Sequence, residues 1–333
     1  MGADDFSVRW TGILRVPASG SYHIALRSDD GVRLWMDGAL VIDDWNDHAA
    51  VIRSARVRLS AGRGHALRLE YYERGGGAQV QLGFIQPVSE GIPAAAAAAS
   101  GADAAVVFAG YSDQLEGEGM DRSSLELPEG QDELIEAVAA ANGNTVVVLQ
   151  SGSPVLIGRW AGKVKAIVQA WYPGEEGGNA IADVLLGRVN PSGKLPVTWP
   201  ARWEDSSAFG RYPGGKGSVD YSEGIFTGYR HFDRKGIEPR FPFGHGLSYS
   251  TFSYSMLSAD VLDGSAVSPE VVVSAYVSNA GRTAGAEVAQ LYVQEAAPDV
   301  ERPSAELKGF QRVELAPGET KRVSFRLDRA AFA

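Results

Sequence analysis

Cysteine is absent from the 333 residues of the sequence, which excludes disulfide frameworks, thiolate metal sites and cysteine nucleophiles. No apolar run reaches the roughly 18 residues that a membrane span needs, so no membrane partner is expected. Basic residues are outnumbered by acidic ones, 31 to 41, and form no cluster. Nucleic acid is therefore not expected as a partner, because phosphate binding needs a concentrated basic face. No signal peptide is visible, and cytoplasmic and secreted locations both stay open.

Several motifs of catalytic and metal sites are also missing. No G-x-S-x-G elbow of a serine hydrolase occurs. The segment 187–195, GRVNPSGKL, has five residues between its glycines where a phosphate loop has four, and it precedes a predicted strand. No two histidines have the i, i+4 spacing of a helical metal pair, so we predict no metal site and no cofactor. The histidines are His23, His48, His65, His231 and His245.

The first region, to about residue 88, has the pattern of an all-β domain. Short alternating segments are separated by turn signals, which is typical of a sandwich or barrel. The clearest is a hairpin over 31–43, in which Val32, Leu34 and Met36 share one face and Asp37-Gly38 supplies the tight turn. The other expected strands lie in FSVRWTGIL, GSYHIAL, HALRLEYYE and AQVQLGF.

The stretch SDDG, residues 28–31, places Asp29 and Asp30 just before a hairpin strand. Asp and Gly are turn formers, so a polar turn is the favoured interpretation. The alternative is a contact to Ca²⁺ or to sugar hydroxyls, because both favour carboxylate oxygens. We carry Asp29 and Asp30 forward as candidate substrate-binding residues.

The Ala-rich segment 89–103 is predicted to be a linker, with a short helix as the open alternative. Beyond it, over 104–249, apolar runs alternate with helical patterns, which indicates an α/β domain with a mostly parallel sheet. Continuous apolar runs predict strands buried on both faces. The expected strands are 104–110, 145–150, 165–171 and 195–200, and the expected helices are 131–142 and 175–187.

From 202 to about 246 the sequence is rich in aromatics and glycine without periodicity, which indicates an ordered wrapping segment. Residues 250–333 alternate again and predict a second β-sandwich. The pattern stops where one more strand is expected, so this sandwich is predicted to be truncated.

The stretch EGEGMDR, residues 116–122, lies between the strand at 104–110 and the helix at 131. A connection of about 20 residues is far longer than usual, and ligands of open parallel sheets bind beyond the carboxyl ends of the strands. Gly117 and Gly119 flank Glu118 and allow close approach of a substrate. Arg122 is expected to hold Asp121 or Glu126. The alternative is a solvated acidic loop.

At this point the sequence resembles family 3 glycoside hydrolases, the β-glucosidases and their relatives. The segment GEGMDR followed by LELPEGQDELI is similar to the acid/base loop of that family. Residues 1–88 resemble a PA14 domain, inserted in some of these enzymes before the acid/base half, and 250–333 resemble the family's fibronectin type III-like domain. Further matches, in order, are SGSPV, AWYPGEEGGNAIADVLLGRVNPSGKLPVTWP, DYSEGIFTGYRHFD, FPFGHGLSYSTF and RPSAELKGFQRVELAPGE.

The resemblance implies retaining hydrolysis of a β-glucoside or short oligosaccharide by two carboxylates. It maps the general acid/base onto Glu118, with Asp121 and Arg122 supporting the loop. The nucleophile and most sugar-binding residues would come from an N-terminal (β/α)₈ barrel, for which this sequence has no room. The sequence thus resembles the C-terminal part of a longer enzyme, or one half of a split one. The alternative is a non-catalytic carbohydrate-binding or adhesion module.

Overall fold

A computed structural model describes residues 4–85, 88–112, 115–119, 122, 124–212, 214, 218–263, 265 and 269–332. The chain divides into two compact units. One contains Met1–Ala105 with Glu133–Asn144, and the other contains Val106–Asp132 with Thr145–Ala333.

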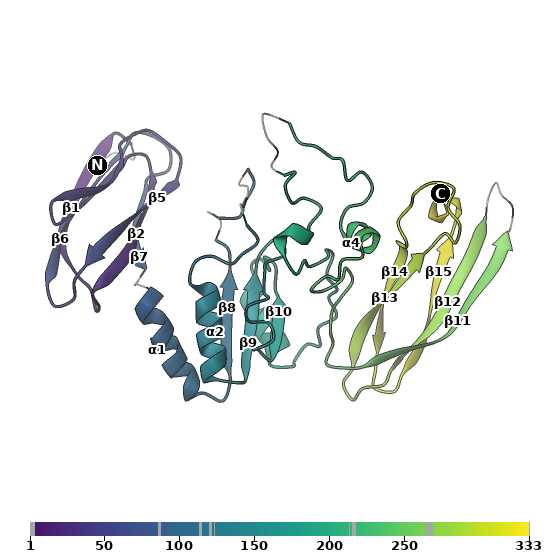
Figure 1. Ribbon diagram of the computed structural model, residues 1–333. Coiled ribbons are helices and arrows are strands. Elements are labelled where there is room, and N and C mark those ends of the chain that lie inside the picture. The colour runs from purple at the N-terminus through teal and green to yellow at the C-terminus, as the bar shows by residue number, and fades with distance from the viewer. Residues whose placement is uncertain are drawn as a thin grey trace. The chain divides into compact units, whose positions relative to one another are not determined.

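The N-terminal strands form two antiparallel sheets, as the alternating patterns predicted (Figure 1). One sheet has the order β1-β6-β3-β4 and the other β5-β2-β7. Only β5 was not anticipated, since its segment VIRSARVRL interrupts the apolar alternation with arginine and serine. The strands are β1 (Phe6–Arg15), β2 (Gly20–Asp29), β3 (Val32–Met36), β4 (Ala39–Asp44), β5 (Val51–Leu59), β6 (Gly64–Glu73) and β7 (Gln79–Ile85).

The β3–β4 hairpin forms as predicted, and its inward face enters the core of this region. Val32, Leu34 and Met36 are buried in one cluster with residues of β2 and β6. Asp37 and Gly38 both have positive φ, 49° and 84°. This is the backbone that a two-residue type I′ turn requires, and Asp-Gly is a preferred pair for it.

The Ala-rich segment at 89–103 is helical over most of its length, so the alternative of a short helix describes it. Helix α1 spans Val88–Ser100. Alanine has the highest intrinsic helix propensity, which explains why a low-complexity run forms a regular element. The helix ends in a turn whose carbonyls at Ala99 and Ala102 accept hydrogen bonds from the side chain of Asn142.

The central region has a sheet of order β10-β9-β8, with β8 at Ala105–Gly110, β9 at Thr145–Gln150 and β10 at Ala166–Gln169. Strands β9 and β10 pair in parallel, which agrees with the predicted α/β class. The expected helices are present as α2 (Gln131–Ala141) and α3 (Gly177–Leu185). Burial on both faces is correct for β9, but it is wrong for β8 and β10. In β8, Val106 and Phe108 are 44% and 54% exposed while Val107 and Ala109 are buried, so only one face of the strand is covered, and no residue of β10 is buried.

The strand predicted at 195–200 does not form. Only an isolated antiparallel bridge links Trp199 to Phe241. Pro196 and Pro200 lack the N–H that a sheet ladder needs, which explains why an apolar run fails to extend as a strand. The segment after it is irregular, as predicted, apart from a 3₁₀ turn η1 (Trp203–Asp205) and the unanticipated helix α4 (Tyr229–Lys235).

The C-terminal region forms two further antiparallel sheets, β11-β12-β15 and β13-β14 (Figure 1). Their core contains Val277, Ala289, Leu315 and Val323. This agrees with the predicted second sandwich. The elements are β11 (Phe252–Asp263), β12 (Glu270–Asn279), β13 (Gly285–Val293), β14 (Glu306–Leu315), β15 (Thr320–Leu327) and the short turn η2 (Arg329–Ala331).

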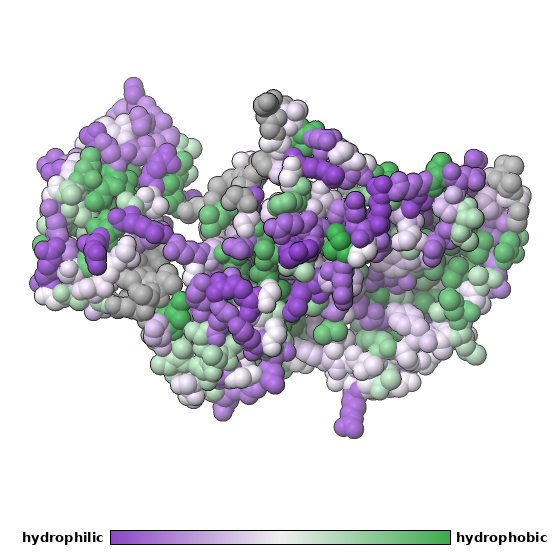
Figure 2. All heavy atoms as spheres, in the orientation of Figure 1, coloured by the Kyte–Doolittle hydropathy of each residue, from purple (hydrophilic) through white to green (hydrophobic). Residues whose placement is uncertain are grey.

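The surface carries no extended apolar face on the side shown in Figure 2, where hydrophobic and hydrophilic residues are interspersed. Among the described residues, no helix has both the length and the apolar character needed to cross a bilayer.

Gln131, the first residue of α2, ties the end of β8 in place. Its side-chain oxygen accepts from the Gly110 N–H at 2.7 Å, and its amide donates to the Gly110 carbonyl at 2.9 Å. Replacing Gln131 with leucine is expected to lower the free energy of unfolding by about 1–3 kcal/mol, since two partly buried backbone groups lose their partner. Urea unfolding measures this loss. Gln81→Leu on β7, whose side chain is exposed, is the matched control, and equal losses in both variants would contradict the assignment.

Candidate functional site

The loop between β8 and α2 follows the carboxyl end of its strand, where parallel sheets bind ligands. Within it, Glu116 closes a turn by donating its N–H to the Ser112 carbonyl. Gly119 has a φ of 74°, a conformation that favours glycine, and the space around its α-carbon is open. The loop therefore presents Glu118 between two glycines, with its side chain exposed.

Glu116, two residues earlier, is fixed by groups from the two neighbouring strands of the sheet. Its Oε2 accepts from the Gly152 N–H at 2.7 Å, and its Oε1 accepts from the Ser153 hydroxyl at 2.8 Å. The Tyr172 hydroxyl also donates to Oε2. Gly152 and Ser153 follow β9 and Tyr172 follows β10, so the ends of three adjacent strands meet at this carboxylate.

Arg122 adds a positive charge beside Oε1 of Glu116. Its Nε lies 3.5 Å from Oε1 of Glu116, and its Nη2 donates to the Ser153 hydroxyl. Its guanidinium lies over the ring of Tyr111, 4.4 Å from the centroid. The expectation that Arg122 supports the loop thus has a partner in Glu116, which sequence reasoning had not selected. Of the two partners proposed from the sequence, Asp121 lies outside the described residues, and Glu126 is described but forms no ion pair with Arg122.

The surroundings of Glu116 keep it ionised. Burial alone raises the pKa of this carboxyl, but hydrogen bonds from Tyr172, Gly152 and Ser153, together with Arg122, outweigh it and lower the pKa. Burial and the bond to Glu116 raise the pKa of Tyr172 to about 12, so its hydroxyl remains a donor. A carboxylate that accepts several donors is a poor source of protons, so Glu116 has the properties of an anchor for the loop.

The backbone around the anchor is tightly constrained. A β-carbon added to Gly152 would lie 3.1 Å from the Tyr172 ring and 3.5 Å from the carboxylate of Glu116. Trp171 has a φ of 53°, which is rare for a bulky residue. Such strained conformations cluster at functional sites. The anchor is therefore built from close packing as well as from charge.

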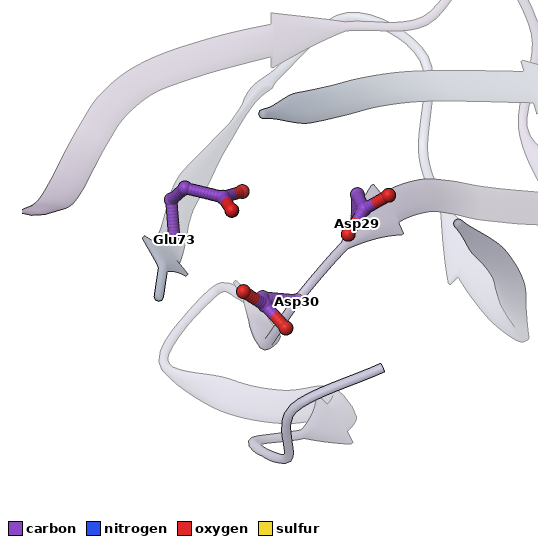
Figure 3. A group of neighbouring side chains, drawn as sticks. All are labelled: Asp29, Asp30 and Glu73. Carbon is purple, nitrogen blue, oxygen red and sulfur yellow. The ribbon is translucent and has the colours of Figure 1, made fainter. Parts of the chain in front are cut away.

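Asp29 and Asp30 belong to the other compact unit. Asp29 ends β2, and Asp30 occupies the turn to β3 with a φ of 60°. The carboxylate of Asp30 accepts backbone N–H groups of His48 and Arg74, and these bonds, that of Arg74 first, lower its pKa. The predicted polar turn is thus present. Glu73, which was not selected from the sequence, lies beside both aspartates (Figure 3).

Comparison with known proteins finds matches to most of the chain. Residues 19–249 match the Glycosyl hydrolase family 3 C-terminal domain, and residues 287–333 match the Fibronectin type III-like domain. The sequence is 52% identical over 236 residues, 71% of this chain, to thermostable beta-glucosidase B of Acetivibrio thermocellus. It is 38% identical over 351 residues, 97% of this chain, to probable beta-glucosidase I of Aspergillus terreus.

Solved structures give the same relationship. The crystal structure of a beta-glucosidase from Kluyveromyces marxianus in complex with glucose matches 99% of this chain with a TM-score of 0.81 and 37% identity. DesR, a beta-glucosidase from Streptomyces venezuelae in complex with D-glucose, matches 98% with a TM-score of 0.75 and 36% identity. The chain spans 31% and 42% of the two curated relatives and 41% and 42% of these two structures.

Proposed function

Because the chain belongs to glycosyl hydrolase family 3, we propose that it supplies the general acid/base of a retaining β-glucosidase, and that Glu118 is that residue. The observation that carries the proposal is the contrast between the two glutamates of residues 116–119. Glu116 is tied down and ionised, whereas Glu118 is exposed between glycines at the carboxyl end of the sheet. Of these two, Glu118 is available to meet a substrate.

In the proposed reaction Glu118 acts twice. It first donates its proton to the glycosidic oxygen as the bond to the anomeric carbon breaks and a nucleophilic carboxylate of the enzyme attaches to that carbon. It then removes a proton from water, which displaces the carboxylate and releases the sugar. The nucleophile stands about 5–5.5 Å from the acid/base in retaining enzymes. We propose that an N-terminal (β/α)₈ barrel, which precedes this part in the full-length enzyme or forms a separate chain, carries it.

The substrate of this proposal is a terminal β-D-glucosyl residue. Relatives of this chain are named beta-glucosidases, and two matching structures are described as complexes with glucose. We further propose the domain division 1–88 (PA14-like), 104–249 (α/β) and 250–333 (fibronectin type III-like). Membership of a hydrolase family favours this function over that of a non-catalytic carbohydrate-binding module.

Reconstitution tests the proposal. The isolated chain is expected to hydrolyse 4-nitrophenyl β-glucoside at the background rate, because one of the two carboxylates is missing. Adding or fusing a family 3 barrel is expected to raise the rate by at least about 10³-fold, a small part of the 10⁶-fold or more that enzymes reach. The control is the same barrel with its nucleophilic aspartate changed to asparagine. A stable complex without activity would contradict the proposed role.

A further inference from the structure

Three carboxylates lie together at one end of the N-terminal sheets. Asp29 is the last residue of β2, Asp30 follows it in the turn, and Glu73 is the last residue of β6. One oxygen of each lies within 4.8 Å of the others. Figure 3 shows the three side chains converging on one space from two strands and the turn. Elements distant in sequence thus bring three negative charges to one point.

Glu73 occupies a position where an apolar residue is expected. Alternation along β6 turns it to the same face as Leu69 and Tyr71, which belong to the hydrophobic core. Its relative exposure is 1%, and its Oε1 is buried without a hydrogen-bond partner. Glutamate is almost never fully buried unless it is paired. The described residues provide no partner for this oxygen, so its environment favours a bound ligand.

The groups around the cluster donate hydrogen bonds but leave its charge uncompensated. The Tyr71 hydroxyl donates to Oε2 of Glu73 at 2.5 Å. Within the part of the chain that the structure describes, no lysine or arginine forms an ion pair with the three carboxylates. Asp30 accepts three backbone N–H groups, from His48, Arg74 and Gly75, at 3.0, 2.8 and 3.4 Å.

We propose that Asp29, Asp30 and Glu73 bind one divalent cation, and that Ca²⁺ is the ion that fits. Ca²⁺ takes oxygen ligands at about 2.3–2.6 Å, so oxygens on opposite sides of it are about 4.6–5.2 Å apart. Mg²⁺ ligands stand at about 2.0–2.1 Å in near-ideal octahedral geometry, which three carboxylates fixed by the fold do not readily adopt. The oxygens of the cluster lie within 4.8 Å of one another, and the longer and more flexible coordination of Ca²⁺ accommodates them. Each carboxylate oxygen also has two lone pairs, so a hydrogen bond does not prevent coordination.

Bound Ca²⁺ would join the end of β2 to the end of β6, which belong to different sheets of this region. It would supply the missing partner of Oε1 of Glu73 and neutralise two of the three charges. An ion that binds the folded chain and not the unfolded one stabilises the fold. A Ca²⁺ contact at Asp29 and Asp30 was the less favoured alternative to a polar turn, and Glu73 has no local signal because it is more than 40 residues from SDDG and lies within an ordinary alternating strand.

Thermal unfolding of the full chain, after treatment with a chelator, tests the site. Ca²⁺ at 5 mM is expected to raise the Tm of the N-terminal transition by at least about 4 °C, and Mg²⁺ at 5 mM by less than half of that. Glu73→Gln should abolish the Ca²⁺ shift without lowering the Tm of the metal-free chain, because it removes a repelling charge. Asp29→Asn, at a less buried position, should reduce the shift.

Asp4→Asn, an exposed carboxylate in the same region, is the matched control and should leave the Ca²⁺ shift unchanged. Tb³⁺ luminescence provides a second readout, since Tyr71 is bonded to Glu73 and can sensitise the ion. Sensitised emission should saturate at one ion per chain, fall on adding Ca²⁺ and be lost in Glu73→Gln. The absence of any Ca²⁺ shift in the original chain, or an undiminished shift and emission in Glu73→Gln, would overturn the proposal.

Discussion

Replacing Glu118 with glutamine is expected to lower kcat for cellobiose by about 10²–10⁴-fold in the enzyme completed with its barrel. Glutamine keeps the size of the side chain but has no acidic proton to give to the leaving oxygen. A sugar leaving group is a poor one, so its departure depends on that proton. The structure provides the setting for this role, because the side chain is exposed and its neighbours are glycines.

The leaving group decides how the loss divides between the two steps. The leaving group of a 2,4-dinitrophenyl glucoside is dinitrophenolate, which departs without protonation. Formation of the glycosyl-enzyme from this substrate should therefore be nearly unaffected in Glu118→Gln. The slow step then becomes attack by water, and a burst of dinitrophenol should precede it. Azide needs no general base, so it should restore turnover and yield glucosyl azide. Steady-state and burst kinetics with the two substrates measure these effects.

Glu126→Gln is the matched control, since Glu126 lies in the same loop with an exposed side chain. Its activity should remain within about twofold of the original, because surface substitutions away from a site have small effects. Full activity in Glu118→Gln would refute the assignment. Equal losses in the two variants would show that the loop responds to any change of charge and would contradict a specific role.

Elements with local signals can be predicted from this sequence, and those that depend on distant context cannot. The β3–β4 hairpin follows from Asp37-Gly38 and three alternating apolar residues. Helix α2 follows from apolar spacing over 131–142. The predicted burial of β8 on both faces was wrong because an apolar run does not reveal whether both faces of the strand are covered. The predicted strand at 195–200 was wrong because its two prolines lack the N–H groups of a sheet ladder, whatever the apolar character of the segment.

The candidate site also has one part that could be predicted from the sequence and one part that could not. The long loop and its position after β8 made Glu118 a candidate, and the resemblance to a family selected it. The anchoring role of Glu116 has no local signal, since its partners Gly152, Ser153 and Tyr172 are 36, 37 and 56 residues away. These contacts form only when three strand ends are brought side by side. The position of Glu118 therefore depends on tertiary structure, whereas its selection as the candidate acid/base needed only the sequence.

Removing the anchor is expected to lower kcat by about 10²-fold in the completed enzyme, because a misplacement of about 1 Å costs that much. Glu116→Gln cannot accept all of the donors that now hold the carboxylate, and it leaves Arg122 without its counter-charge. Tyr172→Phe removes one of these donors and should cost less. Because both variants break the same bond, the double variant should lose less than the product of the single losses. Tyr276→Phe, on β12, is the matched control for the tyrosine.

The contribution of Glu116 to the free energy of unfolding should depend on pH. The pKa of Glu116 in the folded chain is below its ordinary value of 4.5, so its contribution to stability is present above about pH 4.5 and is lost as the pH falls through the folded pKa. The difference in unfolding free energy between the original chain and Glu116→Gln should therefore shrink on acidification. A constant difference from pH 7 to pH 3 would contradict an ionised anchor.

Azide separates positioning from proton transfer in the two glutamates. In Glu118→Gln the missing group is a base, and a small anion that attacks directly bypasses it. In Glu116→Gln the base is present but misplaced, and it still has to protonate the leaving oxygen in the first step. With the dinitrophenyl glucoside as substrate for both variants, azide should therefore restore turnover of Glu118→Gln by at least about tenfold and change that of Glu116→Gln far less. Azide rescue of Glu116→Gln, with none of Glu118→Gln, would mean that the two glutamates have been assigned to each other's roles.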